Sequence, residues 1–213
     1  MKKMVVLISG QGTNLQAIID ACRAGEIKAE IAAVISNKTD AFGLQRAKNA
    51  KIDTALFERG QFADDALMDQ AIGDYIETLQ ADLIVLAGYM KILTAGFVQR
   101  FAGRILNIHP SLLPKFPGLN TYRQALDAGE TEHGTTVHFV NEKVDGGAIV
   151  LQAKVPIFPE DGIEDIEQRV KTQELQIYPL VVKWFVEGRL QLIGNNAFLD
   201  GKVLPPQGYA ADE

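Results

Sequence analysis

Two side chains that could stabilise a developing oxyanion are separated by one residue, where Asn107 and His109 lie at the end of the predicted strand Arg104–Ile108. Alternate residues of a strand point to the same side, and open α/β sheets bind ligands at the carboxyl ends of their strands. An amide donor beside a protonated imidazole can stabilise a developing oxyanion. The alternative is that His109 only forms a hydrogen bond at the end of a strand. The pairing of His109 with Asn107, in a segment that prolines stiffen, favours a catalytic role.

A carboxylate follows later in the chain, in the segment Val144–Gly147, between two runs that are expected to be extended. Asp-Gly is common turn chemistry, so a turn alone would explain Asp145. Its functional alternative is a partner for His109 that favours the cationic form of the imidazole. The sequence sets no distance between the two side chains, so both interpretations stay open.

A third group of candidates lies near the start of the chain, where the first apolar run leads into Ser9–Leu15 and two glycines precede Thr13 and Asn14. Glycines at a strand-to-helix turn let backbone N–H groups approach an anion, and the helix N-terminus adds positive potential. A phosphate site and a plain turn with Thr13 or Asn14 as the helix cap explain the segment equally well. Leu15 replaces the third glycine of the dinucleotide fingerprint, and no Walker-type lysine follows.

Glu174 falls within an apolar stripe of the helix that we predict over Ile163–Val186. A carboxylate that points to a core needs a buried partner or meets a ligand. A small rotation of the helix would instead place Glu174 at the solvent boundary, and the sequence does not decide between these positions.

A loop is predicted after the apolar run Leu83–Ala87, where Met90, Ile92 and Leu93 are apolar. Such side chains at the carboxyl end of a strand can form the wall of a pocket for a flat aromatic ligand. Ordinary packing explains them as well, so this signal is weak by itself.

The elements that must position these groups alternate regularly in the first half of the chain. Apolar runs predict strands, and helical patterning predicts the helices between them, at Met4–Ser9, Asn14–Ala24, Glu30–Ser36, Phe42–Ala50, Asp53–Phe57, Ala63–Gln80, Ala81–Ala87 and Arg104–Ile108. Continuous apolar strands that alternate with helices indicate a doubly wound α/β fold, with a mostly parallel central sheet and helices on both faces.

The pattern changes in the C-terminal half, where we expect an antiparallel addition to the sheet. The predicted antiparallel pairs are Glu132–Val140 with Ala148–Pro156, and Asn196–Leu199 with Lys202–Leu204. The helix Ile163–Val186 lies between the two pairs, and we expect a kink at Pro179, which cannot donate a hydrogen bond to the carbonyl of Leu175.

The composition excludes several classes of protein. The single Cys22 cannot form an internal disulfide or supply a thiolate cluster, and His133 and His138 have no suitably spaced ligand partners, so we expect no metal. A formal net charge of -6 disfavours nucleic acid, and apolar runs far shorter than the ~20 residues that span a bilayer disfavour a membrane. We therefore expect a cytoplasmic protein, with one domain over residues 1–213 because no linker or repeat divides the chain.

Taken together, several segments resemble the phosphoribosylglycinamide formyltransferases, which belong to the folate-dependent formyltransferase group. These segments are Val5–Gln16, Leu86–Leu93, Leu106–Pro114, His133–Val140, Asp145–Gly147 and Leu204–Tyr209. The resemblance covers nearly the whole chain and implies a Rossmann-like formyltransferase catalytic domain. The Asn-x-His-Pro-Ser loop is shared by the wider group, whereas Gly12-Thr13-Asn14 is more particular to the purine enzymes.

This resemblance implies transfer of a formyl group from 10-formyltetrahydrofolate to the amino group of glycinamide ribonucleotide in de novo purine biosynthesis. The amine would attack the formyl carbon directly while Asn107 and protonated His109 stabilise the oxyanion. Asp145 would support the charge of His109 and assist proton transfer. The folate is a co-substrate, no metal is implied, and the enzyme would act as a monomer or homodimer.

The resemblance also implies binding roles. Gly12, Thr13 and Asn14 would bind the phosphate and ribose of the nucleotide, and Glu174 would accept hydrogen bonds from the ribose hydroxyls. The implied folate-binding residues are Met90, Lys91, Ile92, Leu93, Asn107, Asn141 and Asp145. Two positions depart from the family pattern: Asp65 stands where a basic residue can assist the folate, and Lys171 where a glutamine can lie near the phosphate.

Other functions compete with this interpretation. A formyltetrahydrofolate hydrolase would use water as the acceptor, and an initiator-tRNA formyltransferase would use an aminoacyl-tRNA. Both should carry an additional domain, for which we expect no room in a chain that the motifs already fill. A non-catalytic nucleotide sensor would bind ligands without turnover, and it would not need Asn107, His109 and Asp145 together.

Overall fold

The computed structural model describes residues 1–210, so residues 211–213 of the expected domain lie outside the described residues. The chain divides into two compact units, the first over Met1–Asn107 and the second from Ile108 onward. Strand β5 (Ile105–His109) contains the boundary between them. The expectation of one domain over residues 1–213 stays a prediction.

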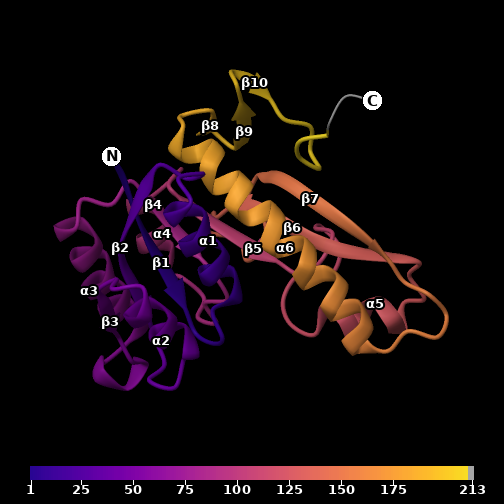
Figure 1. Ribbon diagram of the computed structural model, residues 1–213, viewed down its shortest axis with the longest axis horizontal. Coiled ribbons are helices and arrows are strands. Elements are labelled where there is room, and N and C mark those ends of the chain that lie inside the picture. The colour runs from indigo at the N-terminus through magenta and orange to yellow at the C-terminus, as the bar shows by residue number, and fades with distance from the viewer. Residues whose placement is uncertain (211–213) are drawn as a thin grey trace. The chain divides into compact units, whose positions relative to one another are not determined.

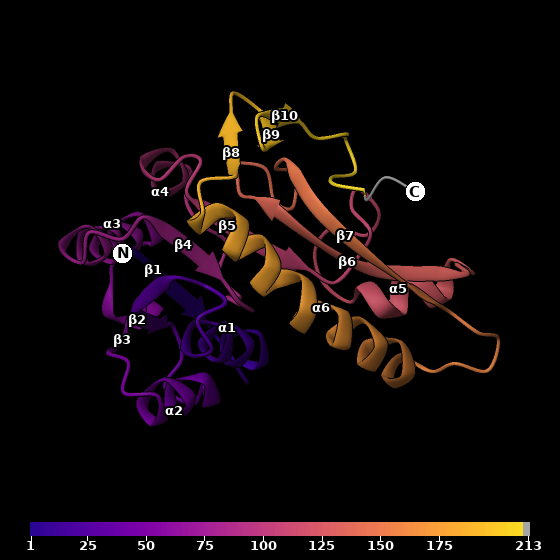
Figure 2. The same ribbon diagram turned by 45° about the horizontal axis from the view of Figure 1, so that its top comes forward.

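The first unit alternates strands with helices, as predicted. Its other elements are β1 (Lys2–Ile8), α1 (Thr13–Arg23), β2 (Ala29–Ser36), α2 (Phe42–Asn49), β3 (Thr54–Leu56), the 3-10 helix η1 (Arg59–Gln61), α3 (Asp65–Thr78), β4 (Leu83–Leu86) and α4 (Ala95–Arg100). In Figure 1 and Figure 2, α1 and α2 lie on one face of these strands, and α3 and α4 lie on the opposite face. Val5, Val6 and Leu7 of β1 are completely buried because helices cover both faces of the strand.

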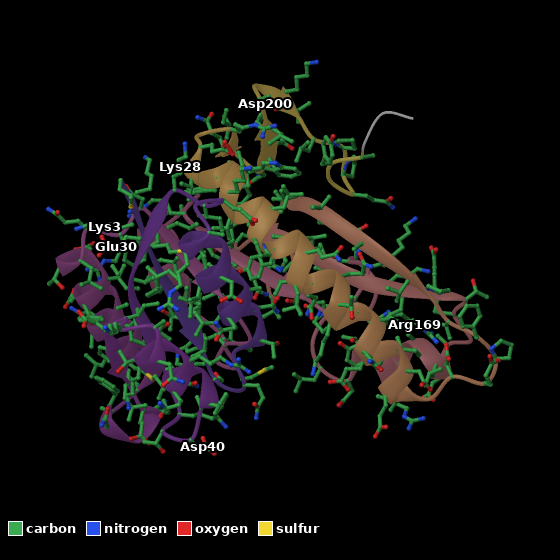
Figure 3. All side chains as sticks on the ribbon, in the orientation of Figure 1. Lys3, Lys28, Glu30, Asp40, Arg169 and Asp200 are labelled. Atoms are coloured by element: carbon green, nitrogen blue, oxygen red, sulfur yellow. The ribbon has the colours of Figure 1, made fainter. Side chains whose placement is uncertain are left out.

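The main sheet has seven strands in the order β3-β2-β1-β4-β5-β6-β7, which confirms the predicted doubly wound fold with its antiparallel addition. Strand β1 pairs in parallel with both β2 and β4, and Lys3 and Glu30 are register partners across β1 and β2 (Figure 3). The strand order reverses between β1 and β4, so the loops after these two strands leave the same edge as neighbours. Folds of this type bind ligands at such a reversal.

The second unit is built around the predicted antiparallel pair. Its elements are α5 (Thr121–Asp127), β6 (Glu132–Phe139), β7 (Ile149–Pro156), α6 (Ile163–Val186), β8 (Leu190–Ile193), β9 (Asn196–Leu199) and β10 (Lys202–Val203). Helix α6 packs across both β6 and β7 (Figure 1), and it contains Pro179, whose expected kink stays a prediction. Strands β9 and β10 form the predicted terminal hairpin, to which β8 adds a third strand.

The connection from β6 to β7 depends on a glycine. A Cβ atom at Gly147 would lie 1.7 Å from the carbonyl oxygen of Phe139, so the two chain segments pass too closely for any side chain. Asp145, two residues earlier, has a left-handed backbone with a φ of 52°. The close approach at Gly147 therefore holds the turn that carries Asp145 against the end of β6.

Candidate active site

The end of β5 and the turn after β6 bring His109 and Asp145 together. His109 Nδ1 lies 3.6 Å from Asp145 Oδ2, and the two side chains are 8% and 10% exposed. Their separation is long for a hydrogen bond but suits an ion pair when the imidazole is protonated. Limited contact with water strengthens the attraction between such charges. The pair can therefore hold a cationic imidazole beside a carboxylate.

The other nitrogen of His109 identifies the tautomer. Nε2 lies 2.9 Å from the carbonyl oxygen of Phe116. A carbonyl only accepts hydrogen bonds, so Nε2 carries a proton, and Nδ1 is the nitrogen that faces Asp145. The same loop contacts the carboxylate, because the backbone N–H of Gly118 donates to Asp145 Oδ2 at 2.8 Å. The loop that carries Phe116 and Gly118 thus contacts both members of the pair.

A second imidazole lies beside Asp145. His138 Nε2 is 4.0 Å from Asp145 Oδ1, and His138 Nδ1 lies 2.9 Å from the carbonyl oxygen of Phe139. Burial lowers the pKa of His138, which favours its neutral form. Burial likewise lowers the pKa of His133, whose ring packs edge-on against Tyr122. Neither histidine therefore competes with His109 for the role of the cation.

Glu174 is buried within the second unit. Its side chain is 7% exposed and accepts a hydrogen bond from Thr135 Oγ1 at 3.2 Å, and the same hydroxyl contacts the carbonyl oxygen of His109 at 3.0 Å. Burial raises the pKa of Glu174 to about 7, an effect that the Thr135 hydrogen bond opposes. The structure thus favours the interior position over the solvent boundary. A buried carboxylate with few donors can accept further hydrogen bonds from a ligand.

The glycine loop opens helix α1 without a side-chain cap. Gly12 is the N-cap residue, with a left-handed φ of 76°, so the alternative in which Thr13 or Asn14 caps the helix is wrong. A Cβ atom on Gly12 would lie 2.8 Å from the Cα atom of Gly43, which explains the need for glycine there. Asn14 Oδ1 is buried without a hydrogen-bond partner among the described residues. No side chain thus occupies the first N–H groups of α1, and the buried amide oxygen of Asn14 lacks a donor among the described residues.

The loop after β4 carries exposed apolar side chains. Met90 is 69% exposed and Ile92 is 71% exposed, unlike the buried strand that precedes them. The side chain of Lys91 instead contacts helix α3, where its Nζ lies 2.7 Å from Asp69 Oδ1. Nearby on α3, Asp65 pairs with Arg59 at 2.7 Å. The loop therefore presents apolar groups, while its lysine is engaged within the first unit.

The turn after β6 also carries Asn141, which shapes the turn from within. Its side chain accepts a hydrogen bond from the backbone N–H of Lys143 at 2.9 Å and donates one to the carbonyl oxygen of Gly146 at 3.2 Å. Asn141, Gly146 and Gly147 also border a cavity of about 690 Å³, which the C-terminal segment around Gln207 lines as well. The segment that positions Asp145 is therefore accessible to a ligand.

The structure groups the predicted residues by unit. His109, Asp145 and Glu174 are connected within the second unit through the contacts described above, and Asn107 precedes them on β5. The predicted residues of the first unit are Gly12, Thr13, Asn14, Met90, Lys91, Ile92, Leu93 and Asn107. His138, Thr135 and Asp69 were not among the predicted site residues, although the first two lie in the segment His133–Val140 that carries the family resemblance.

Comparison with known proteins decides the family. Residues 2–182 match the formyl transferase family model. The chain belongs to this family. A phosphoribosylglycinamide formyltransferase of Haemophilus influenzae is 70% identical to this formyl transferase over 210 residues, which are 99% of each chain. An Escherichia coli K12 protein of the same name is 57% identical over 99% of each chain.

Solved structures confirm the fold of this formyl transferase. A phosphoribosylglycinamide formyltransferase from Coxiella burnetii matches it with a TM-score of 0.94 and 48% identity, over 98% of each chain. Within residues 1–210, no helix is long and apolar enough to cross a membrane. The same residues contain no cluster of three or more His, Cys, Asp or Glu side chains that could hold a metal ion.

Proposed function

We propose that this formyl transferase moves the formyl group of 10-formyltetrahydrofolate to the amino group of glycinamide ribonucleotide in de novo purine biosynthesis. The observation that carries the proposal is the similarity of the chain, over 99% of both sequences, to the phosphoribosylglycinamide formyltransferase of Haemophilus influenzae. The protein acts in the cytoplasm, as a monomer or homodimer, without a metal and without nucleic acid as a partner. The pair formed by His109 and Asp145 suits this chemistry.

In the proposed reaction the amine nitrogen attacks the formyl carbon, and the electrons of the C=O double bond move to oxygen. The side-chain amide of Asn107 and the imidazolium of His109 donate hydrogen bonds to this oxyanion. The electron pair on the oxyanion then re-forms the C=O bond as the bond between carbon and the folate nitrogen breaks, and this nitrogen takes up the proton that the amine loses. The products are the formylated amine and tetrahydrofolate, and no covalent enzyme intermediate forms.

The geometry of His109 adds a requirement to this mechanism. One ring nitrogen faces Asp145, and the other donates to the Phe116 carbonyl. If the oxyanion accepts a hydrogen bond from Nε2, it must therefore take the place of the Phe116 carbonyl oxygen as the acceptor. Asp145 keeps its place beside Nδ1 and stabilises the cation throughout the reaction.

The nucleotide is proposed to bind through two groups of residues. Gly12, Thr13 and Asn14 bind the phosphate and ribose, which the uncapped helix N-terminus and the unpartnered Asn14 Oδ1 support. Glu174 accepts hydrogen bonds from the ribose hydroxyls, which its burial and its Thr135 contact support. Ligand donors would then offset the cost of burying this carboxylate.

The folate is proposed to bind against Met90, Lys91, Ile92 and Leu93, together with Asn107, Asn141 and Asp145. The exposed side chains of Met90 and Ile92 support an apolar wall for the pterin ring. The lysine side chain is held by Asp69, so Lys91 contributes through its backbone. Asp65 stays outside the set because it pairs with Arg59.

A formyltetrahydrofolate hydrolase is the competing activity, and one assay separates the two. Tetrahydrofolate release is followed with 10-formyltetrahydrofolate alone and then with glycinamide ribonucleotide added. We expect release to depend on the nucleotide. Equal release with and without it would replace the transferase proposal with hydrolysis.

A further inference from the structure

The loop between β4 and α4 has no regular secondary structure, although the proposed function assigns four of its residues to the folate. A loop of this kind keeps one shape only where side chains or backbone groups anchor it. One anchor is Ser9, whose Oγ accepts a hydrogen bond from the backbone N–H of Met90 at 2.8 Å. The hydroxyl of Tyr89 is buried without a hydrogen-bond partner among the described residues, so it is not a second anchor.

Asp69 of helix α3 provides the other anchor, and it uses both carboxylate oxygens. Oδ1 binds Lys91 Nζ at 2.7 Å, and Oδ2 accepts a hydrogen bond from the backbone N–H of Thr94 at 2.7 Å. Its two contacts therefore hold both ends of the stretch between Lys91 and Thr94. Thr94 is also the N-cap of α4, since its Oγ1 accepts from the backbone N–H of Phe97.

The ion pair between Asp69 and Lys91 is buried. Asp69 is 2% exposed and the side chain of Lys91 is 10% exposed, so the pair is largely removed from water. Loss of Lys91 would leave the Asp69 charge buried without its ionic partner, whereas loss of Asp69 would leave Lys91 Nζ with only the carboxylate of Asp65, 3.9 Å away. Between the two anchored residues, the apolar side chain of Ile92 stays exposed. The contacts of Asp69 thus direct the lysine inward and leave an apolar surface outside.

We propose that Asp69 is a positioning residue for the formyl-donor site, which holds the loop Met90–Leu93 in the shape that binds the folate. This inference rests on the proposed function and deepens it. Asp69 acts through Lys91 and Thr94 and does not touch the donor. The charge of Lys91 serves the fold of the loop, so the donor meets the lysine backbone and its apolar neighbours.

The test compares Asp69→Asn with Asp74→Asn, a control on the same helix. Asp74 binds Arg100 at 2.8 Å on an exposed surface and makes no contact with the loop. Asp69→Asn should raise the KM for 10-formyltetrahydrofolate at least about tenfold, while kcat and the KM for glycinamide ribonucleotide change little. Asp74→Asn should match the wild type in all three values.

A second measurement needs no activity. Hydrogen–deuterium exchange of the unliganded protein should show faster exchange of the backbone N–H of Thr94 and its neighbours in Asp69→Asn, with no change in Asp74→Asn. Where Asp69→Asn fails to fold, the double variant Asp69→Asn, Lys91→Met decides, because it leaves no buried charge unpaired. It should show the same exchange and KM effects.

An unchanged KM for the donor in these variants would overturn the proposal, whatever the exchange shows, because the shape of the loop would then not matter to the donor. Absence of nucleotide-dependent turnover in the wild-type protein is a separate result. It would overturn the proposed function, while exchange would still report whether Asp69 anchors the loop.

Discussion

His109 Nδ1 lies 3.6 Å from Asp145 Oδ2, across a contact that is mostly shielded from solvent. The other ring nitrogen, Nε2, donates to the Phe116 carbonyl. The carboxylate thus lies within ion-pair distance of the imidazole. The proposed oxyanion stabilisation depends on this relationship.

Replacement of the carboxylate tests the relationship directly. Asp145→Asn keeps the size of the side chain but removes its charge, so we expect kcat to fall by about a hundredfold to a thousandfold with little change in thermal stability. Asp127→Asn, which removes an exposed carboxylate of α5, should leave kcat unchanged. A rate near that of the wild type in Asp145→Asn would remove the carboxylate from the mechanism.

Binding of the nucleotide should depend on pH through Glu174. Its pKa is about 7, so the carboxyl is increasingly protonated below that pH, and the neutral group is a weaker acceptor for the ribose hydroxyls than the carboxylate. We expect the KM for glycinamide ribonucleotide to fall between pH 6 and pH 8. The phosphate of the nucleotide also ionises near pH 6. In Glu174→Gln the KM should still change with ionisation of the phosphate, but the part of the pH dependence that comes from Glu174 should be lost. Identical profiles of KM against pH in the wild type and Glu174→Gln would contradict the role of Glu174.

Burial of Glu174 should also cost stability. Its pKa lies above the ordinary value of 4.5, so the folded protein binds this proton more tightly and stability falls as the pH rises from about 4.5 to 7. Glu174→Gln lacks this cost and should be more stable at pH 8, by up to about 3 kcal/mol, with little difference near pH 5. Urea unfolding at both pH values measures the free energy of unfolding, and Glu187→Gln, at the exposed end of α6, is the control. Equal stability of wild type and Glu174→Gln at pH 8 would show that burial carries no cost.

The turn after β6 should tolerate no side chain at Gly147. The added Cβ of Gly147→Ala would collide with the Phe139 carbonyl, which we expect to cost about 2 kcal/mol or more and to lower kcat by displacing Asp145. Gly60→Ala is the control, since its Cβ would have no atom within 4 Å. Thermal unfolding and kcat of the two variants provide the comparison. A Gly147→Ala protein as stable and active as the control would contradict the tight approach.

Much of the fold was predictable because buried parallel strands have continuous apolar runs. Strand β1 illustrates this, while the apolar stripe of α6 predicted that helix with the bounds that the structure has. Helix α4 was missed because its six residues are too few to establish a helical period. Strand β3 is shorter than the predicted Asp53–Phe57, since only Thr54–Leu56 pair with β2.

The site was predictable where residue type and strand position coincide, as at Asn107 and His109. The distance to Asp145 was not, because it depends on contacts between residues far apart in the chain. The Phe116 carbonyl had no signal at all, since every residue has a backbone oxygen. The alternative of a cap at Thr13 or Asn14 is wrong because Gly12 occupies the N-cap position of α1, without a side-chain cap.

The most direct test of the central claim follows the formyl carbon itself. The protein is incubated with glycinamide ribonucleotide and 10-formyltetrahydrofolate that carries ¹³C in the formyl group, and mass spectrometry locates the label. The account predicts ¹³C on the amino group of the nucleotide, at a rate that Asp145→Asn strongly reduces. Label found only in formate, with the nucleotide unmodified, would contradict it.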